Sequence, residues 1–231
     1  MSNNKTLNSP SGVGGKTLGL VHTSATLVSV FAELCSKYLP HVKTFNIVDD
    51  SLIMNTIACG ELTPDTSRRV VNYAGSAQDA GADFILFTCS SIGPAVEAAA
   101  ILTKVPVLRV DQPMADQAVH LGKRIGVIAT LPTTLEPTSD LVKRRAKAAG
   151  KEIILTSKLC EGAFDALMSG DAATHDKKVG DALKQLSTEV DVIVLAQASM
   201  ARVVDTLSEA DKKVPILASP PIAIQYLATV L

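Results

Sequence analysis

Tryptophan is absent from this sequence, and aromatic residues make up only 3% of it. Cysteine is also scarce, and no two of the cysteines form a C-x-x-C pair: they are Cys35, Cys59, Cys89 and Cys160. This wide spacing is typical of free thiols in a reducing compartment and argues against a disulfide framework. The histidines are scattered as well, so no metal site is expected. Together these absences predict a cytoplasmic protein with free thiols and no bound metal.

The chain also lacks an excess of charge and a long apolar run. Its formal net charge is −1, and its densest basic cluster is Lys143-Arg144-Arg145, so we expect no nucleic-acid partner. No apolar run is long enough to cross a bilayer, so we expect no membrane span. Residues 1–16 are polar and rich in glycine and serine, and they have no apolar core of the kind that a secretion signal needs. We expect them to form a flexible tail.

What the sequence does contain is a regular alternation of short apolar segments with segments of helical spacing. Such an alternation predicts an α/β fold with parallel strands. Strands are expected at 18–22, 42–48, 84–87, 105–110, 124–129, 152–157, 191–196 and 214–217. Helices are expected at 26–38, 52–59, 65–80, 94–102, 136–149, 162–169, 174–189, shortly after 200, and at 221–230.

The second half of the chain repeats the first. Three pairs of segments match at nearly the same spacing: Asp83–Cys89 with Asp191–Gln197, Val105–Leu108 with Val214–Leu217, and Gly19–Thr23 with Gly126–Thr130. The repeat predicts two similar lobes, each a four-stranded parallel sheet flanked by helices, with an active site in the cleft between them. We place lobe 1 at residues 17–112 and lobe 2 at 113–218, and we expect a C-terminal helix (219–231) to pack back on lobe 1.

Cys89 occupies the most informative position in the chain. It follows a strand buried on both faces (84–87) and precedes a helix (94–102) that has Pro94 in its first turn. Ligands of open parallel sheets bind at the carboxyl ends of the strands. Free amides and the helix dipole at that position also favour anions, including a thiolate. A buried, inert cysteine is the ordinary alternative, but the polar residues around Cys89 have no obvious structural role.

Polar residues follow several other strands in the same way. They are rich in hydroxyl groups and poor in charge: Thr23, Ser24, Ser90, Ser91, Thr130, Thr133, Thr134, Gln197 and Ser199. Such a set suits a small carboxylate held by hydrogen bonds and helix N-termini. The same donors can stabilise an enediolate, which forms when the α-carbon of a carboxylate loses a proton or carbon dioxide.

On these residues the chain resembles the aspartate/glutamate racemase superfamily, which includes hydantoin racemase, maleate isomerase and arylmalonate decarboxylase. The matching segments are Thr88–Ser91, Ile125–Thr130 with Thr133, and Val192–Leu195 leading into Gln197. The resemblance implies an enzyme that acts at the α-carbon of a small carboxylate without cofactor or metal. It also implies a homo-oligomer, and it assigns Cys89 to the catalytic thiol of the first lobe.

The sequence departs from this pattern in the second lobe, where Gln197 stands in place of the second cysteine and cannot exchange a proton near neutral pH. Cys89 is therefore expected to act as a single thiol, to share the work with a second base, or to attack the substrate covalently. Candidates for the second base are His22 and Cys160, although a satisfied strand-end histidine and a packed cysteine are ordinary explanations for them. A racemase or isomerase is the leading expectation, with a one-cysteine decarboxylase or lyase, or a non-catalytic carboxylate-binding protein, as alternatives.

Overall fold

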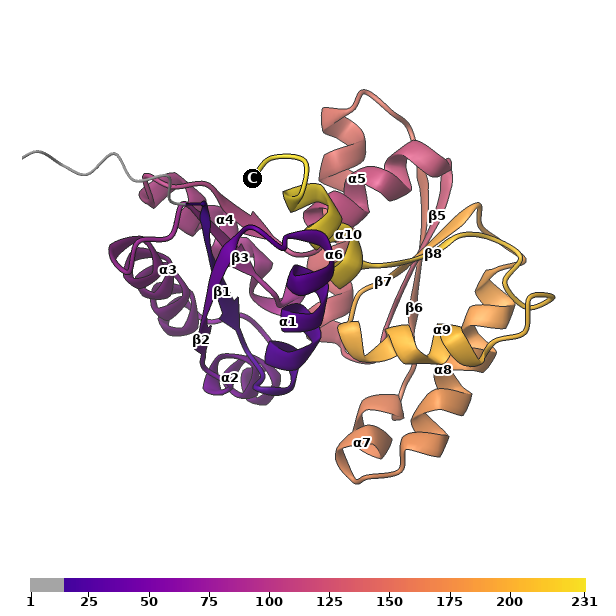
Figure 1. Cartoon of the computed structure of the whole chain (residues 1–231). Helices are drawn as coiled ribbons and strands as arrows, with labels where there is room; N and C mark the ends of the chain where they lie inside the picture. Colours follow the sequence, from indigo (N-terminus) through magenta and orange to yellow (C-terminus); the bar gives the residue numbers. More distant parts are fainter. Residues whose placement is uncertain (1–14) are drawn as a thin grey trace, which may run out of the picture.

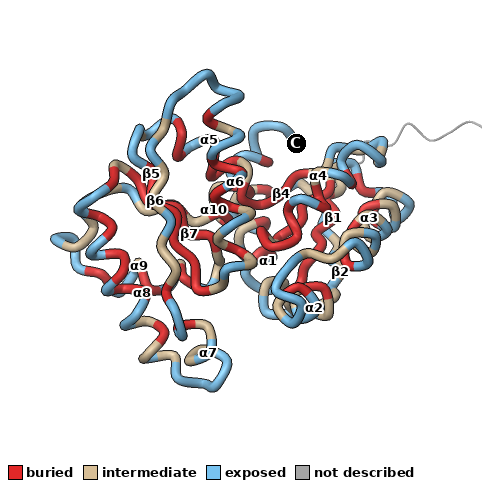
Figure 2. Tube along the Cα trace, turned by 180° about the vertical axis from the view of Figure 1, so that it is seen from behind, coloured by how far each residue is buried: buried red, intermediate tan, exposed pale blue. Residues whose placement is uncertain are grey.

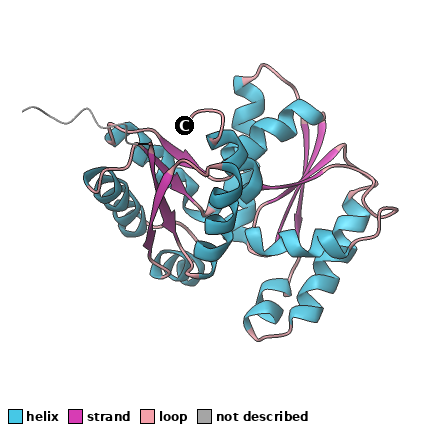
Figure 3. Ribbon diagram, viewed as in Figure 1, coloured by secondary structure: helices cyan, strands magenta, loops and turns pink. Residues whose placement is uncertain are grey.

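The computed structural model describes residues 15–231, so the expected tail lies almost entirely outside the described residues. Two separate parallel sheets, each of four strands, stand side by side with helices on both faces (Figure 3). The first has the order β2-β1-β3-β4 and the second β6-β5-β7-β8. Their strands are β1 (Thr17–His22), β2 (Lys43–Val48), β3 (Phe84–Phe87), β4 (Val107–Arg109), β5 (Arg124–Ala129), β6 (Ile154–Leu159), β7 (Val192–Leu195) and β8 (Ile216–Ala218). The predicted fold class, two similar α/β lobes, is confirmed.

The helices connect successive strands. They are α1 (Thr26–Tyr38), α2 (Ser51–Cys59), α3 (Pro64–Asp79), α4 (Gly93–Leu102), α5 (Gln112–Leu121), α6 (Pro132–Ala148), α7 (Ala163–Met168), α8 (Ala172–Leu186), α9 (Ala201–Thr206) and α10 (Ser219–Leu227). Two short 3-10 helices, η1 (Ser90–Ile92) and η2 (Ala198–Met200), follow β3 and β7. No helix among residues 15–231 is long and apolar enough to cross a membrane.

The two lobes also share an equivalent side-chain hydrogen bond. Asp83, just before β3, accepts a hydrogen bond from the Thr17 backbone N–H at 2.8 Å. Asp191, just before β7, accepts one from the Arg124 backbone N–H, also at 2.8 Å. In each lobe, therefore, an aspartate preceding the third strand fixes the start of the first. The apolar faces of the sheets are buried beneath the helices, whose outer sides are exposed (Figure 2).

The structure differs from the sequence-based expectation at two helices. Helix α6 begins at Pro132, four residues before its expected start, so Thr133 and Thr134 belong to its first turn and not to a loop. Pro137 lies inside α6, in its second turn, where it lacks an N–H to donate within the helix. Helix α5 was not expected, because Asp111 and Gln112, which are its N-cap and first residue, were interpreted as a connection between the lobes. Three strands also begin two residues later than expected: β4 at 107 and not 105, β6 at 154 and not 152, and β8 at 216 and not 214.

The chain returns to the first lobe at its end. Helix α10 lies in the middle of the molecule, against α1 and α5 (Figure 1). Its apolar side chains Ala223, Ile224 and Leu227 join the core that contains Leu18 and Phe31. Because burying apolar surface stabilises the contact between elements, α10 ties the end of the second lobe to α1 of the first.

Candidate active site

The carboxyl ends of β3 and β5 are brought together by helix α6, whose first turn packs against η1. The hydroxyl groups of Ser91 in η1 and Thr134 in α6 are 2.8 Å apart and form a buried hydrogen bond between the two lobes. The turn after β3, which carries Cys89, therefore lies beside the helix N-terminus that carries Thr133. Ser91, expected to bind substrate, has its hydroxyl engaged with Thr134 in this structure.

Cys89 is extended (φ −129°, ψ 125°) and stands immediately before η1, which continues into α4. Its side chain is partly exposed, whereas its neighbours Thr88 and Ser90 are buried. A thiolate at this position faces the positive end of the helical segment that follows it. Cys89 thus combines partial exposure with a position at the start of a helical segment.

Gln197 holds the equivalent position in the second lobe. Its backbone is also extended (φ −131°, ψ 137°), and η2 follows it as η1 follows Cys89. Its side-chain oxygen accepts hydrogen bonds from the Thr130 backbone N–H at 2.6 Å and from the Thr130 hydroxyl at 2.9 Å. Gln197 therefore fixes the turn after β5, and the Thr130 hydroxyl, expected to bind substrate, donates to it.

Thr133 differs from Ser91 and Thr130, whose hydroxyls are engaged in hydrogen bonds. Its hydroxyl is buried and has no hydrogen-bond partner within residues 15–231. It lies in the first turn of α6, where Pro132 has no N–H and the Thr134 and Leu135 N–H groups bond to the Leu131 carbonyl, which leaves the Thr133 N–H as the donor of that turn. A buried hydroxyl without a partner is costly, and the dipole of a helix N-terminus favours negative charge. This turn can therefore accept an anion such as a carboxylate.

His22 lies at the end of β1, in the same lobe as Cys89, and is fully buried. Its Nδ1 is 2.9 Å from the Thr88 hydroxyl, and its Nε2 is 2.8 Å from the side-chain oxygen of Asn46. Burial lowers the pKa of His22, so the ring is neutral near pH 7. With both ring nitrogens engaged, the geometry favours a structural role for His22 over that of a second base.

Cys160 is also buried, within the apolar core that includes Ala163 and Val179. Burial raises the pKa of the Cys160 thiol to about 11, and that of Cys35 to about 11 as well. Both thiols therefore stay neutral near pH 7, which argues against Cys160 as the second base. Cys59 is exposed at the end of α2, away from the strand-end turns.

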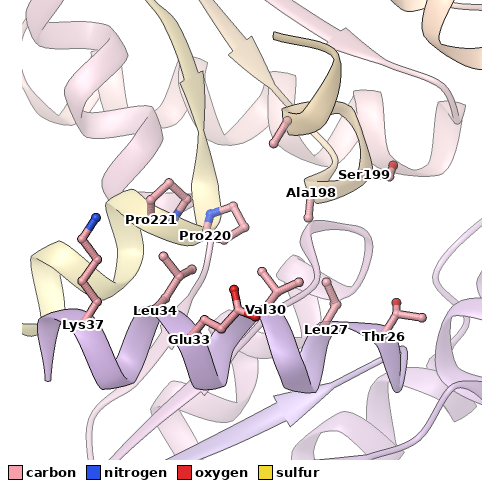
Figure 4. A pocket seen from close by; sticks show the side chains of 11 residues that line it. Thr26, Leu27, Val30, Glu33, Leu34, Lys37, Ala198, Ser199, Pro220 and Pro221 are labelled. Atoms are coloured by element: carbon pink, nitrogen blue, oxygen red, sulfur yellow. The ribbon is translucent and has the colours of Figure 1, made fainter. Parts of the chain in front are cut away.

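The remaining predicted site residues, Thr23, Ser24 and Ser199, also lie just after the carboxyl ends of strands. Thr23 is buried, and the Ser24 hydroxyl is 2.8 Å from that of Thr26 at the start of α1. Ser199 is exposed and lines a cavity of about 540 Å³ between α1, η2 and the start of α10 (Figure 4). The cavity walls are largely apolar: Thr26, Leu27, Val30, Glu33, Leu34, Lys37, Ala198, Ser199, Ala201, Pro220 and Pro221. Cys89 is not among them, so the cavity reaches the turn after β7 through Ala198 and Ser199 but is not lined by the thiol.

Sequence reasoning missed the charged residues beneath the Cys89 turn. Arg109 at the end of β4 is 1% exposed and pairs with Asp111, which is 0% exposed. The sequence gives no signal for this cluster, because Gly93 and Glu97, which the guanidinium also contacts, come from another element. Among residues 15–231 there is no group of three or more histidine, cysteine, aspartate or glutamate side chains that could hold a metal ion.

Two repeated parallel α/β lobes, with a partly exposed thiol in the turn after β3 and the start of α6 packed beside that turn, define a class of two-lobed α/β proteins. The chain belongs to the Asp/Glu/hydantoin racemase family, whose sequence model matches residues 18–227. No curated protein is similar enough in sequence to count as a relative.

Solved structures of racemases share the fold. A glutamate racemase from Bacillus anthracis superposes with a TM-score of 0.70 at 18% identity, covering 94% of this chain and 82% of its own. An aspartate racemase from Picrophilus torridus gives 0.69 at 16% identity, covering 93% of this chain and 95% of its own. An allantoin racemase from Klebsiella pneumoniae gives 0.67 at 14% identity, covering 94% and 87%.

Proposed function

We propose that this protein is a cofactor-independent enzyme that moves a proton at the α-carbon of a small carboxylate, with Cys89 as its single catalytic thiol. The observation that carries the proposal is the contrast between two equivalent turns. One presents the partly exposed Cys89, and the other presents Gln197, whose amide is bound to Thr130 and has no proton to exchange near neutral pH.

The proposed first step uses the donors of both lobes. The first turn of α6, with the hydroxyl and the backbone N–H of Thr133, holds the substrate carboxylate. The Cys89 thiolate takes the α-proton, and the electron pair of the C–H bond moves into the carboxylate to give an enediolate. The helix N-terminus then lies where negative charge develops, which is the arrangement that lowers such a barrier.

Return of the proton completes the reaction. Cys89 gives a proton back to the α-carbon, and the electron pair returns from the enediolate to form the new C–H bond. With one thiol, the proton returns mainly to the face from which it left, so α-hydrogen exchange outpaces inversion. Inversion then requires a proton delivered to the opposite face by water or by another group, because Gln197 supplies none.

Decarboxylation is the second candidate, and the replacement of the second thiol by Gln197 favours it. Loss of carbon dioxide from a malonic acid breaks a C–C bond and leaves its electron pair in the same enediolate. A single protonation by the Cys89 thiol then completes the product. Only one proton donor is needed, and the thiolate regains its proton from solvent.

A deuterium wash-in assay in D₂O over amino, hydroxy and malonic acids tests both reactions, with carbon dioxide release measured in parallel. We expect at least one acid to exchange or decarboxylate, and Cys89→Ala to lower that rate by about 10²–10⁴-fold, as loss of a general acid or base does. Cys59→Ala is the matched control and keeps full activity. Full activity in Cys89→Ala contradicts the proposal. If no acid turns over and yet malonate protects Cys89 from alkylation, the protein is a carboxylate-binding protein and not an enzyme.

A further inference from the structure

A charged side chain is buried directly beneath the turn that carries Cys89. Arg109 ends β4, and its Nε and Nη2 donate to the two carboxylate oxygens of Asp111 at 2.7 and 2.8 Å. The pair is removed from solvent, since Arg109 is 1% and Asp111 0% exposed. A two-point contact between guanidinium and carboxylate fixes both position and orientation. Asp111 therefore holds the Arg109 guanidinium in one place.

The guanidinium packs against the backbone of Gly93, the residue that joins η1 to α4. A Cβ atom at Gly93 would lie 2.7 Å from Arg109 Nε and closer still to Cζ and Nη2, so only glycine fits. The Gly93 backbone N–H donates to the Ser90 carbonyl and closes the η1 turn. Arg109 therefore packs against the end of the turn that contains Cys89 and Ser90.

The same guanidinium is linked to the second lobe. Glu97 of α4 accepts a hydrogen bond from Arg109 Nη1. Glu97 also accepts two from Arg144 of α6, at 3.0 Å from Nη1 and 2.9 Å from Nη2. Helix α6 carries Thr133 and Thr134 in its first turn, and Thr134 is bound to Ser91. Two connections, one ionic and one between hydroxyls, therefore join the Cys89 turn to α6.

We propose that Arg109 and Glu97 are positioning residues, which hold the Cys89 turn in register with the first turn of α6. The inference rests on the proposed function, in which the two turns bind one substrate. Stability alone is a poor explanation for this network, because burying a guanidinium and a carboxylate costs much of what their attraction returns. The bidentate pair of Arg109 with Asp111 and the Glu97 carboxylate shared by two arginines fix the position of one turn relative to the other.

Hydrogen–deuterium exchange tests the inference without any substrate. Glu97→Leu removes the shared carboxylate, and Glu97→Asp keeps its charge. Arg145→Met is the control, because Arg145 is the neighbour of Arg144 but pairs with Asp116 and not with Glu97. The reporting amides are those of Gly93, bound to Ser90, and of Leu135, bound to Leu131 at 3.0 Å.

We expect Glu97→Leu to raise exchange at both reporting amides about tenfold, the effect of about 1.4 kcal/mol of lost local stability. Glu97→Asp restores most of the protection, and Arg145→Met leaves it unchanged. Unchanged exchange in Glu97→Leu overturns the inference. Exchange that rises equally at all slow amides also overturns it, because it reports general destabilisation.

A second measurement separates positioning from a merely structural role. In a Cys59→Ser background, iodoacetamide labelling followed by peptide mass analysis reports Cys89, and malonate serves as the carboxylate probe. We expect the malonate concentration that half-protects Cys89 to rise about tenfold in Glu97→Leu and to recover in Glu97→Asp. Equal half-protecting concentrations in all variants overturn the positioning role. If malonate gives no protection in the unmutated protein, the proposed carboxylate site fails, and the exchange result alone decides the inference.

Discussion

Substitution of Gly93 by alanine tests the support beneath the Cys89 turn most simply. A methyl group at this position overlaps the Arg109 guanidinium, which is held by Asp111 and cannot move without leaving that carboxylate unpaired. Overpacking a core costs about 1–3 kcal/mol, and separating a buried ion pair costs about 3–5 kcal/mol. Alanine regains about 1 kcal/mol over glycine in a helix. If the guanidinium is displaced from Asp111, the cost of the separated pair less the gain of alanine leaves a loss of about 2–4 kcal/mol of unfolding free energy, which is the loss we expect for Gly93→Ala.

Gly75→Ala is the matched control, because Gly75 lies inside α3 with nothing within 4 Å of an added Cβ. Helix propensity predicts that this variant gains up to about 1 kcal/mol. Urea unfolding followed by circular dichroism measures both variants. A second control removes the clash: in an Arg109→Leu background, Gly93→Ala should cost far less than in the unmutated protein, because neighbouring changes are non-additive. Gly93→Ala as stable as the unmutated protein would refute the packing argument.

Two further predictions concern the strand-end residues. Burial lowers the pKa of His22, so the unfolded chain binds a proton at this ring more readily than the folded chain does. The unfolding free energy therefore falls as the pH drops below about 6.5. It falls by up to about 1.4 kcal/mol per pH unit until the lowered pKa is reached. Urea unfolding between pH 5 and 7 should show this slope in the unmutated protein and a shallower one in His22→Gln; equal slopes contradict the assignment. Thr133→Val removes a buried hydroxyl that has no partner within residues 15–231, so thermal unfolding should show no loss of stability. The malonate concentration that half-protects Cys89 should instead rise about tenfold or more. A variant that unfolds more easily but protects Cys89 as before would show that Thr133 is structural.

The fold was predictable from the sequence because its determinants are local and repeated. Apolar runs of four to six residues define the parallel strands, and the match between the segments ending at Cys89 and Gln197 predicted a second lobe built like the first. Even the extended backbone of these two residues is shared. The position of Cys89 at a strand end therefore follows from patterns that lie within a few residues of it.

The partners of individual side chains were not predictable in the same way. The bond between Ser91 and Thr134 joins two lobes, and the contacts of Arg109 involve β4, α4 and the residues after β4. Such pairings depend on how whole elements pack, which no local pattern encodes. For the same reason the sequence left His22 as either a second base or a satisfied strand-end histidine; in the structure it lies against Phe31 and is bound on both nitrogens.

The central claim is that Cys89 alone moves the proton at one face of the substrate. The most direct test takes a single enantiomer of an acid that the protein turns over in D₂O, and compares the rate of α-deuterium incorporation with the rate of inversion. Deuterium should enter the starting enantiomer faster than the opposite enantiomer appears, and both rates should be lost in Cys89→Ala. Equal rates of exchange and inversion, or exchange that survives in Cys89→Ala, would contradict it.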